Sequence, residues 1–166
     1  MKKKYYVAYG SNLEVDSMLD RCPYAKKVGT AYLDGYKLVF KGIMEDFSYL
    51  TLEKKEGSRV PLGVFEITAL DEELLDVFEG YPKLYTKDNI KIKFKNKEVE
   101  ALIYIMNENF DYYLPSKSYL ITCLKGYRDF GFDKMVLYNS FDNAELKTWT
   151  SKLKFRILKR TFNKIK

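Results

Sequence analysis

Short stretches in which apolar and polar residues alternate constrain the fold of this chain more than any other feature. Residues 90–94 read IKIKF and residues 99–105 read VEALIYI, so every second position is apolar on each side of a Lys95-Asn96-Lys97 turn. A repeat of two residues is typical of a strand with one buried face, whereas a helix repeats about every 3.6 residues. The pattern therefore predicts two strands joined by a short turn.

Turn signals elsewhere predict further strands. We expect a first strand over 5–9, which Gly10-Ser11-Asn12 ends. Asp34-Gly35 is a strong hairpin signal between apolar stretches, and residues 55–58 predict a second hairpin that joins 48–53 to 60–67. About six strands, mostly connected by hairpins, indicate an α+β protein with a largely antiparallel sheet.

Helical spacing appears in three places along the chain. Residues 13–20 suit a helix with Asn12 as its N-cap. Residues 71–78 suit a second helix, with Thr68 as its cap and Gly80-Tyr81-Pro82 as its stop. A third helix is predicted from Pro115 to Gly131, with one apolar face formed by Tyr119, Leu120, Cys123, Leu124 and Tyr127. Residues 133–149 predict one or two short helices.

The absence of histidine excludes more chemistry than any other feature of the composition. Nucleophilic systems with a histidine base and imidazole-ligated zinc sites are impossible, and two lone cysteines cannot build a structural zinc site. We expect no metal and no cofactor. A proton carrier would have to be a carboxylate, lysine, tyrosine or cysteine.

The length, 166 residues, predicts one domain, and the positive charge is confined to its end. Residues 147–166 hold eight of the 29 basic residues and no acidic ones, which leaves 21 basic against 23 acidic residues over 1–146. We expect a folded domain over 1–146 and a basic tail over 147–166, packed as a helix or as a strand extension. With no signal sequence or membrane span in view, and with two reduced thiols, we expect a cytoplasmic protein.

Three segments could carry chemistry, although each also has an ordinary structural explanation. Residues 9–13 form a strand-to-helix turn whose free backbone N–H groups favour an anion, but many capped turns look alike. Glu79 ends a helix, where the dipole should raise its carboxyl pKa toward the range of a proton shuttle. The helical wheel does not distinguish it from Glu72, however, and a solvated glutamate is the simpler explanation. Residues 115–119 read as a capped helix start whose Tyr119 belongs to the core.

The order and spacing of these segments resemble the gamma-glutamylcyclotransferase-like family. The resemblance covers about residues 5–131 and rests on Tyr9-Gly10-Ser11-Asn12-Leu13, Asp34-Gly35-Tyr36, the strand 60–67 (VPLGVFEI), the segment 75–82 (LDVFEGYP) with Tyr85, and the Pro-Ser-x-x-Tyr that ends at Tyr119. The residues after Gly131 match nothing in that pattern.

The resemblance implies a small mixed barrel of six strands surrounded by helices. It implies that Glu79 is the catalytic acid and base, and that the substrate is bound by Tyr9, Gly10, Ser11, Asn12, Leu13, Tyr85 and Tyr119. It also implies that the α-amine of a gamma-glutamyl group attacks its own γ-carbonyl, releasing 5-oxoproline and an amine or amino acid. This intramolecular reaction requires positioning and one proton carrier, which a chain without histidine can supply.

Several alternatives remain open at this point. Gamma-glutamyl amino acids are the first choice of substrate, with gamma-glutamyl amines and gamma-glutamylated antibiotic intermediates as alternatives. The fold could also serve as a small-molecule binding module without catalysis. Nucleic acid or a membrane surface is expected as a partner only if the basic tail binds it. The sequence leaves both a monomer and a homodimer open.

Overall fold

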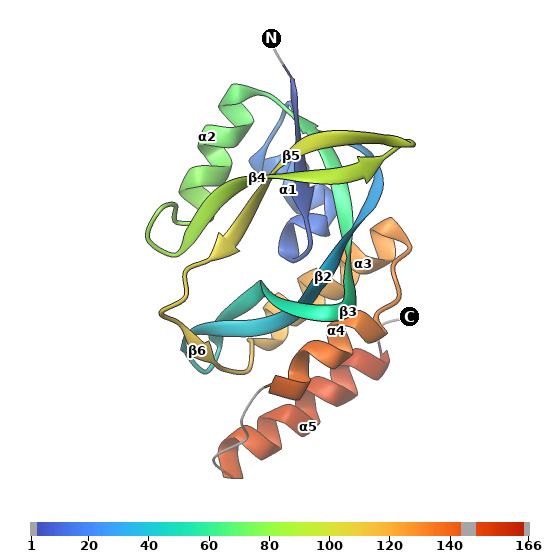
Figure 1. Ribbon diagram of the computed structural model, residues 1–166. Coiled ribbons are helices and arrows are strands. Elements are labelled where there is room, and N and C mark those ends of the chain that lie inside the picture. Colours follow the sequence, from blue (N-terminus) through green and yellow to red (C-terminus); the bar gives the residue numbers. More distant parts are fainter. Residues whose placement is uncertain (1–2, 144–148, 165–166) are drawn as a thin grey trace.

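The computed structural model describes residues 3–143 and 149–164 and shows an α+β protein built on one curled, mixed sheet (Figure 1). The sheet has six strands: β1 Lys4–Ala8, β2 Lys26–Met44, β3 Phe47–Ile67, β4 Tyr85–Phe94, β5 Lys97–Met106 and β6 Asp111–Tyr112. Their spatial order is β4-β5-β1-β3-β2-β6. β1 runs parallel to β5, and all other neighbours are antiparallel. The predicted fold class is therefore confirmed.

The β4–β5 hairpin forms where the alternating pattern predicts it. Lys95 and Asn96 have φ values of 50° and 63°, the left-handed conformations that a tight two-residue hairpin turn requires. Ile92 and Phe94 are buried on one face of β4, while Lys91 and Lys93, which alternate with them, are exposed. The local pattern is sufficient here because both strands and their turn are contiguous in sequence.

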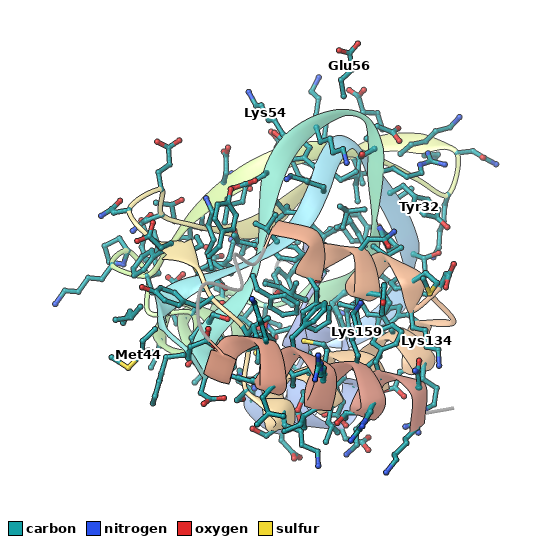
Figure 2. All side chains as sticks on the ribbon, turned by 90° about the horizontal axis from the view of Figure 1, so that it is seen from below. Tyr32, Met44, Lys54, Glu56, Lys134 and Lys159 are labelled. Atoms are coloured by element: carbon teal, nitrogen blue, oxygen red, sulfur yellow. The ribbon has the colours of Figure 1, made fainter. Side chains whose placement is uncertain are left out.

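The two hairpins predicted over 29–40 and 48–67 are wrong, because β2 and β3 instead form one long hairpin that turns at residues 45–46. The expected turns lie opposite each other: Asp34 pairs with Arg59, and the next pair is Tyr36 with Lys54. Gly35 and Gly57 do adopt positive φ values, 79° and 75°, but these bulge the ladder instead of reversing it. Figure 2 shows this excursion, with Lys54 and Glu56 projecting from the arch of the two strands.

The turn after β1 differs from the expectation in a way that matters for the site. Residues Ser11–Leu13 form a 3-10 turn, and the helix α1 begins only at Val15 and ends at Arg21. Glu14, not Asn12, is the N-cap, since its side chain accepts a hydrogen bond from the Ser17 amide. Asn12 is thereby freed from capping, and its side chain is buried inside the protein.

The second and third predicted helices are confirmed. α2 spans Ala69–Phe78 and starts with a reciprocal capping box between Thr68 and Asp71. α3 spans Lys117–Phe130, is capped by Ser116 and ends at Gly131 with a φ of 68°. The predicted apolar face of α3 packs into the core, with Leu120, Cys123, Leu124 and Tyr127 buried.

The chain ends in helical segments that gather at the opposite end of the molecule from α2 (Figure 1). They are α4 Met135–Asn139, the 3-10 turn Ser140–Asn143 and α5 Trp149–Lys164. Leu158 and Phe162 of α5 are buried, and Lys134, labelled in Figure 2, donates to the Phe162 carbonyl. The predicted boundary at residues 146 and 147 lies outside the described residues.

None of the helices in the described ranges combines the length and the apolar character that crossing a membrane requires.

α3 supports the turn after β1 through an unusually close contact at Gly126. Leu13 is fully buried, and it packs between Gly126 of α3 and Gly63 of β3. A methyl group on Gly126 would come within 2.5 Å of the Leu13 Cβ atom and 2.6 Å of the Glu14 amide nitrogen. The backbone of the turn therefore lies directly on the helix.

We predict that Gly126→Ala destabilises the protein although alanine is the better helix former. The added methyl group meets backbone atoms that cannot rotate away, so α3 and the turn must separate. We expect the free energy of unfolding to fall by about 1–3 kcal/mol, the usual cost of overpacking. Urea unfolding measures it, with Lys125→Ala, at an exposed position of the same helix, as the control. An unchanged or higher stability of Gly126→Ala would contradict this packing.

Candidate active site

Two adjoining cavities open where the turn after β1 meets the end of α2. The inner cavity has a volume of about 30 Å³ and is lined mainly by tyrosines and polar groups. The outer cavity, about 380 Å³, is more apolar and lies beside α1, α2 and α3. Both cavities share a wall formed by Ser11, Glu79, Tyr85 and Tyr119. The four shared residues place the two cavities side by side, with Glu79 facing both.

The structure brings almost all of the sequence-predicted site residues to the inner cavity. Its lining includes Tyr9, Gly10, Ser11, Asn12, Glu79, Tyr85 and Tyr119. Leu13 is the exception and needs a correction: it lines neither cavity, because the 3-10 turn points its side chain into the core between two glycines. Its position is that of a core residue supporting the turn.

Glu79 lies at the C-cap of α2, on the wall between the cavities. Its Oε1 atom accepts a hydrogen bond of 2.7 Å from the Asn12 side-chain amide. Burial of the carboxyl group raises its pKa to about 7, while the Asn12 hydrogen bond and the Arg21 charge act in the opposite direction. Burial is thus the main cause, rather than the helix dipole on which the sequence argument relied.

Asn12 connects Glu79 to two further side chains. Its amide nitrogen also donates to the Tyr6 hydroxyl at 2.8 Å, and its carbonyl oxygen accepts a 2.5 Å hydrogen bond from Arg21. Only 3% of Asn12 is exposed, so each of these polar groups needs a protein partner. Both the NH₂ group and the carbonyl oxygen of the Asn12 amide thus have hydrogen-bond partners within the site.

Two tyrosines are fixed by one residue of β3. The Tyr85 hydroxyl donates to the Leu50 carbonyl at 2.8 Å, and the Leu50 amide donates to the Tyr119 hydroxyl at 3.1 Å. Because the Tyr119 oxygen accepts from Leu50, its own proton can be offered elsewhere. A side chain on Gly10 would lie 3.2 Å from this hydroxyl, so the absence of one keeps the turn close to Tyr119.

Sequence reasoning missed several residues of the site. Tyr6, Leu50 and Tyr104 line the inner cavity, and Arg21 lines the outer one. Tyr6 carried no signal of its own, because the predicted strand 5–9 holds three tyrosines. Nothing in the sequence marked Arg21, which reaches the site only because α1 folds back toward the end of α2.

The remaining ionisable groups near the site do not suggest a thiol nucleophile. Cys22 and Cys123 are both buried, and burial raises their thiol pKa values to about 11 and about 12. Thiolates would be scarce at neutral pH. Over the described ranges, no three acidic or cysteine side chains gather closely enough to hold a metal ion.

The sequence profile described as "Gamma-glutamyl cyclotransferase, AIG2-like" matches residues 6–121, and the chain belongs to this family. Among curated proteins, none matches the chain in sequence.

Solved structures share the fold at low sequence identity. A structure described as gamma-glutamyl cyclotransferase and one of an uncharacterized human protein each align with a TM-score of 0.75 and 22% identity, covering 96% of this chain and 99% of the other. YkqA from Bacillus subtilis aligns with a TM-score of 0.73 and 19% identity over 86% of this chain. The alignment spans 56% of YkqA, so that protein is considerably longer. At these identities the likeness concerns the fold.

We predict that Glu79→Gln becomes more stable than the wild type as the pH rises. A carboxyl pKa raised from 4.5 to about 7 means that the folded state binds this proton more tightly than the unfolded state. Glu79 therefore costs stability progressively as the pH rises from about 4.5 through about 7, and glutamine, which does not ionise, avoids that cost. Urea unfolding of both proteins at pH 5 and pH 8 measures the difference. An equal difference at the two pH values would show that the Glu79 pKa is not raised.

Proposed function

We propose that this protein is an enzyme that cyclises a gamma-glutamyl group to 5-oxoproline and releases the attached amine. The α-amine of the substrate attacks its own γ-carbonyl, a five-membered ring closes, and the bond to the leaving nitrogen breaks. Family membership supports the general class, and the site supports the specific chemistry. The observation that carries the proposal is the buried Glu79 carboxyl group on the wall between the two cavities.

Glu79 has the properties that a proton shuttle requires. With a pKa raised to about 7 by burial, the carboxyl group is present in both protonation states near neutral pH. The carboxylate accepts the proton that the attacking amine loses, and the resulting acid gives it to the leaving nitrogen. The proton count balances over the cycle, so Glu79 returns to its initial state without any other group.

The size of the cavities indicates how the substrate lies. The inner cavity, about 30 Å³, has room for only one or two small polar groups, whereas the outer one, about 380 Å³, can hold the bulk of a substrate. We place the reacting end of the gamma-glutamyl group at the shared wall, against Ser11 and Glu79, with Gly10 of the inner cavity beside it. The Tyr119 hydroxyl would donate to the oxygen that becomes negative during attack.

Positioning would supply much of the acceleration. The reaction is intramolecular, and a site that holds the glutamyl chain folded back removes most of the entropic barrier to ring closure. The walls are suited to this because Tyr85 and Tyr119 are both anchored to Leu50 of β3. A rigid wall keeps the amine and the carbonyl at reacting distance.

The outer cavity favours gamma-glutamyl amino acids over gamma-glutamyl amines. Among its lining residues Arg21 is the one basic side chain, and in the described parts of the chain no ion pair of Arg21 is found. A leaving amino acid carries a carboxylate that this guanidinium can bind, whereas a simple amine does not. The aromatic walls, Tyr49 and Phe78, suit an apolar side chain on that amino acid.

We predict that the wild type releases 5-oxoproline from a panel of gamma-glutamyl compounds, and faster from amino acid conjugates than from amine conjugates. Glu79→Gln should reduce this turnover by about two to four orders of magnitude, the usual contribution of a positioned acid or base. Substrate binding, followed by calorimetry, should change much less, because glutamine keeps the shape and the hydrogen-bond acceptor. Glu73→Gln makes the same change at an exposed position of α2 and is the matched control.

Two results would overturn the proposal in different ways. Near-normal 5-oxoproline release by folded Glu79→Gln would show that another group moves the proton. Tight binding of gamma-glutamyl compounds by the wild type without any release would identify a binding module that keeps the fold.

A further inference from the structure

Arg21 is the least expected member of the site, and its contacts link three elements of the fold. It is the last residue of α1, its guanidinium lies 3.3 Å above the centre of the Phe78 ring in α2, and it donates to Asn12 in the turn after β1. Phe78 directly precedes Glu79. Arg21 thus contacts the residues on both sides of the Glu79 carboxyl group without binding the carboxyl group itself.

The hydrogen bond from Arg21 determines which way the Asn12 amide faces. An asparagine amide offers a carbonyl oxygen on one side and an NH₂ group on the other, and rotation by 180° exchanges them. A guanidinium only donates, so it requires the carbonyl oxygen on its side. The NH₂ group must then face Tyr6 and Glu79, as observed at 2.8 and 2.7 Å.

The rotated amide would destabilise the ionised form of Glu79. It would place the Asn12 carbonyl oxygen against the Glu79 Oε1 atom, so the ionised carboxylate would lose a donor and gain a repulsive neighbour. Tyr6 does not prevent this rotation, because a hydroxyl can donate as well as accept. Apart from the ionised Glu79 carboxylate itself, Arg21 is the neighbour of the amide that distinguishes the two orientations, and it does so whether or not Glu79 is protonated.

We propose that Arg21 is a positioning residue for the cyclisation, acting through Asn12 to hold the Glu79 carboxylate in the orientation and charge state that accept the proton of the amine. This inference rests on the proposed function. Arg21 also lines the outer cavity, so its free N–H groups remain available to a leaving group while one is committed to Asn12.

The electrostatic surroundings of Glu79 leave Arg21 as its one charged neighbour at neutral pH. The other ionisable groups that interact with the Glu79 charge are Tyr6 within β1, Tyr9 directly after it, Cys22 beside Arg21, Tyr85 on β4, Tyr104 on β5 and Tyr119 on α3. Burial raises the pKa of each of these groups, so all of them are neutral. Arg21 and the Asn12 hydrogen bond are the two influences that lower the pKa of Glu79.

Arg21→Gln should therefore remove both influences together. Glutamine carries no charge, and its amide can donate or accept, so Asn12 loses the partner that fixed its orientation. We expect the Glu79 pKa to rise by about one unit, at the low end of what a neighbouring opposite charge contributes. The ionised fraction at pH 7 would fall from about one half to about one tenth, which lowers kcat/KM at that pH at least about fivefold.

The test combines a titration that needs no turnover with a pH profile of activity. The Glu79 carboxyl carbon is followed by NMR from pH 5 to 9 in the wild type, Arg21→Gln and Arg59→Gln. Arg59 also lies over an aromatic ring, that of Tyr32, but it is exposed and remote from both cavities, so it is the matched control. In parallel, kcat/KM for 5-oxoproline release is measured across the same range with an amino acid conjugate and an amine conjugate.

The expected result is an upward shift of about one unit in Arg21→Gln, in both the titration and the acidic limb of kcat/KM, and for both substrates. Arg59→Gln should match the wild type. A mutant cycle adds a test of the route: once Asn12→Ala has removed the intermediary, Arg21→Gln should cause a smaller further loss than it does alone. If Arg21→Gln does not fold, Arg21→Lys, which keeps the charge but not the planar donor, should still lower kcat with a smaller pKa shift.

The outcomes separate this inference from the proposed function. Unchanged titration and pH profile in Arg21→Gln would overturn the positioning role, even if the enzyme is active. A loss confined to the amino acid conjugate, with no shift in pH dependence, would overturn it too and leave Arg21 only as a binder of the leaving carboxylate. A wild type that releases no 5-oxoproline would refute the proposed function, whereas the NMR titration would still decide whether Arg21 controls Glu79.

Discussion

The hydrogen bond from the Asn12 amide to the Glu79 carboxyl group joins residues 67 positions apart, and the geometry of the site depends on it. It fixes the turn after β1 against the end of α2, and it gives a buried carboxyl group a donor that keeps ionisation within reach of neutral pH. Without that donor, burial alone would favour the protonated form still more strongly. The pKa of Glu79 is therefore set by desolvation, which raises it, and by the Asn12 amide and the Arg21 guanidinium, which lower it.

The fold holds the turn after β1 in place through close contacts with the neighbouring strands and with α3. β1 lies inside the sheet between β3 and β5, so the turn that follows it starts from a fixed position. Gly126 lets α3 lie directly on that turn, and Leu50 of β3 anchors Tyr85 and Tyr119 on the facing wall. The long β2–β3 hairpin follows the curl of the sheet, whereas α5 packs at the other end, where none of its described residues lines either cavity.

The parts of the fold and site that the sequence predicts are those with local signals. α2, α3 and the β4–β5 hairpin follow from caps, turns and periodicity within about twenty residues, and the family resemblance indicates Glu79 and the turn. The β2–β3 pairing could not be predicted, because the same Asp-Gly signal fits a hairpin turn and a bulge. Asn12 was expected as a helix cap because its local sequence fits one. Its burial beside Glu79 and the role of Arg21 were not predicted, because both depend on tertiary contacts that leave no local pattern.

The central claim is that the Glu79 carboxyl group, poised by burial, moves the proton during cyclisation. The most direct test is the pH dependence of kcat/KM for 5-oxoproline release by the wild-type protein. The account predicts that the logarithm of kcat/KM rises with pH at a slope of one below a pKa of about 7 and levels off above it, as the Glu79 carboxylate forms. A profile that stays flat from pH 5 to 9 while 5-oxoproline is released would contradict it, because no group with the raised pKa would then take part.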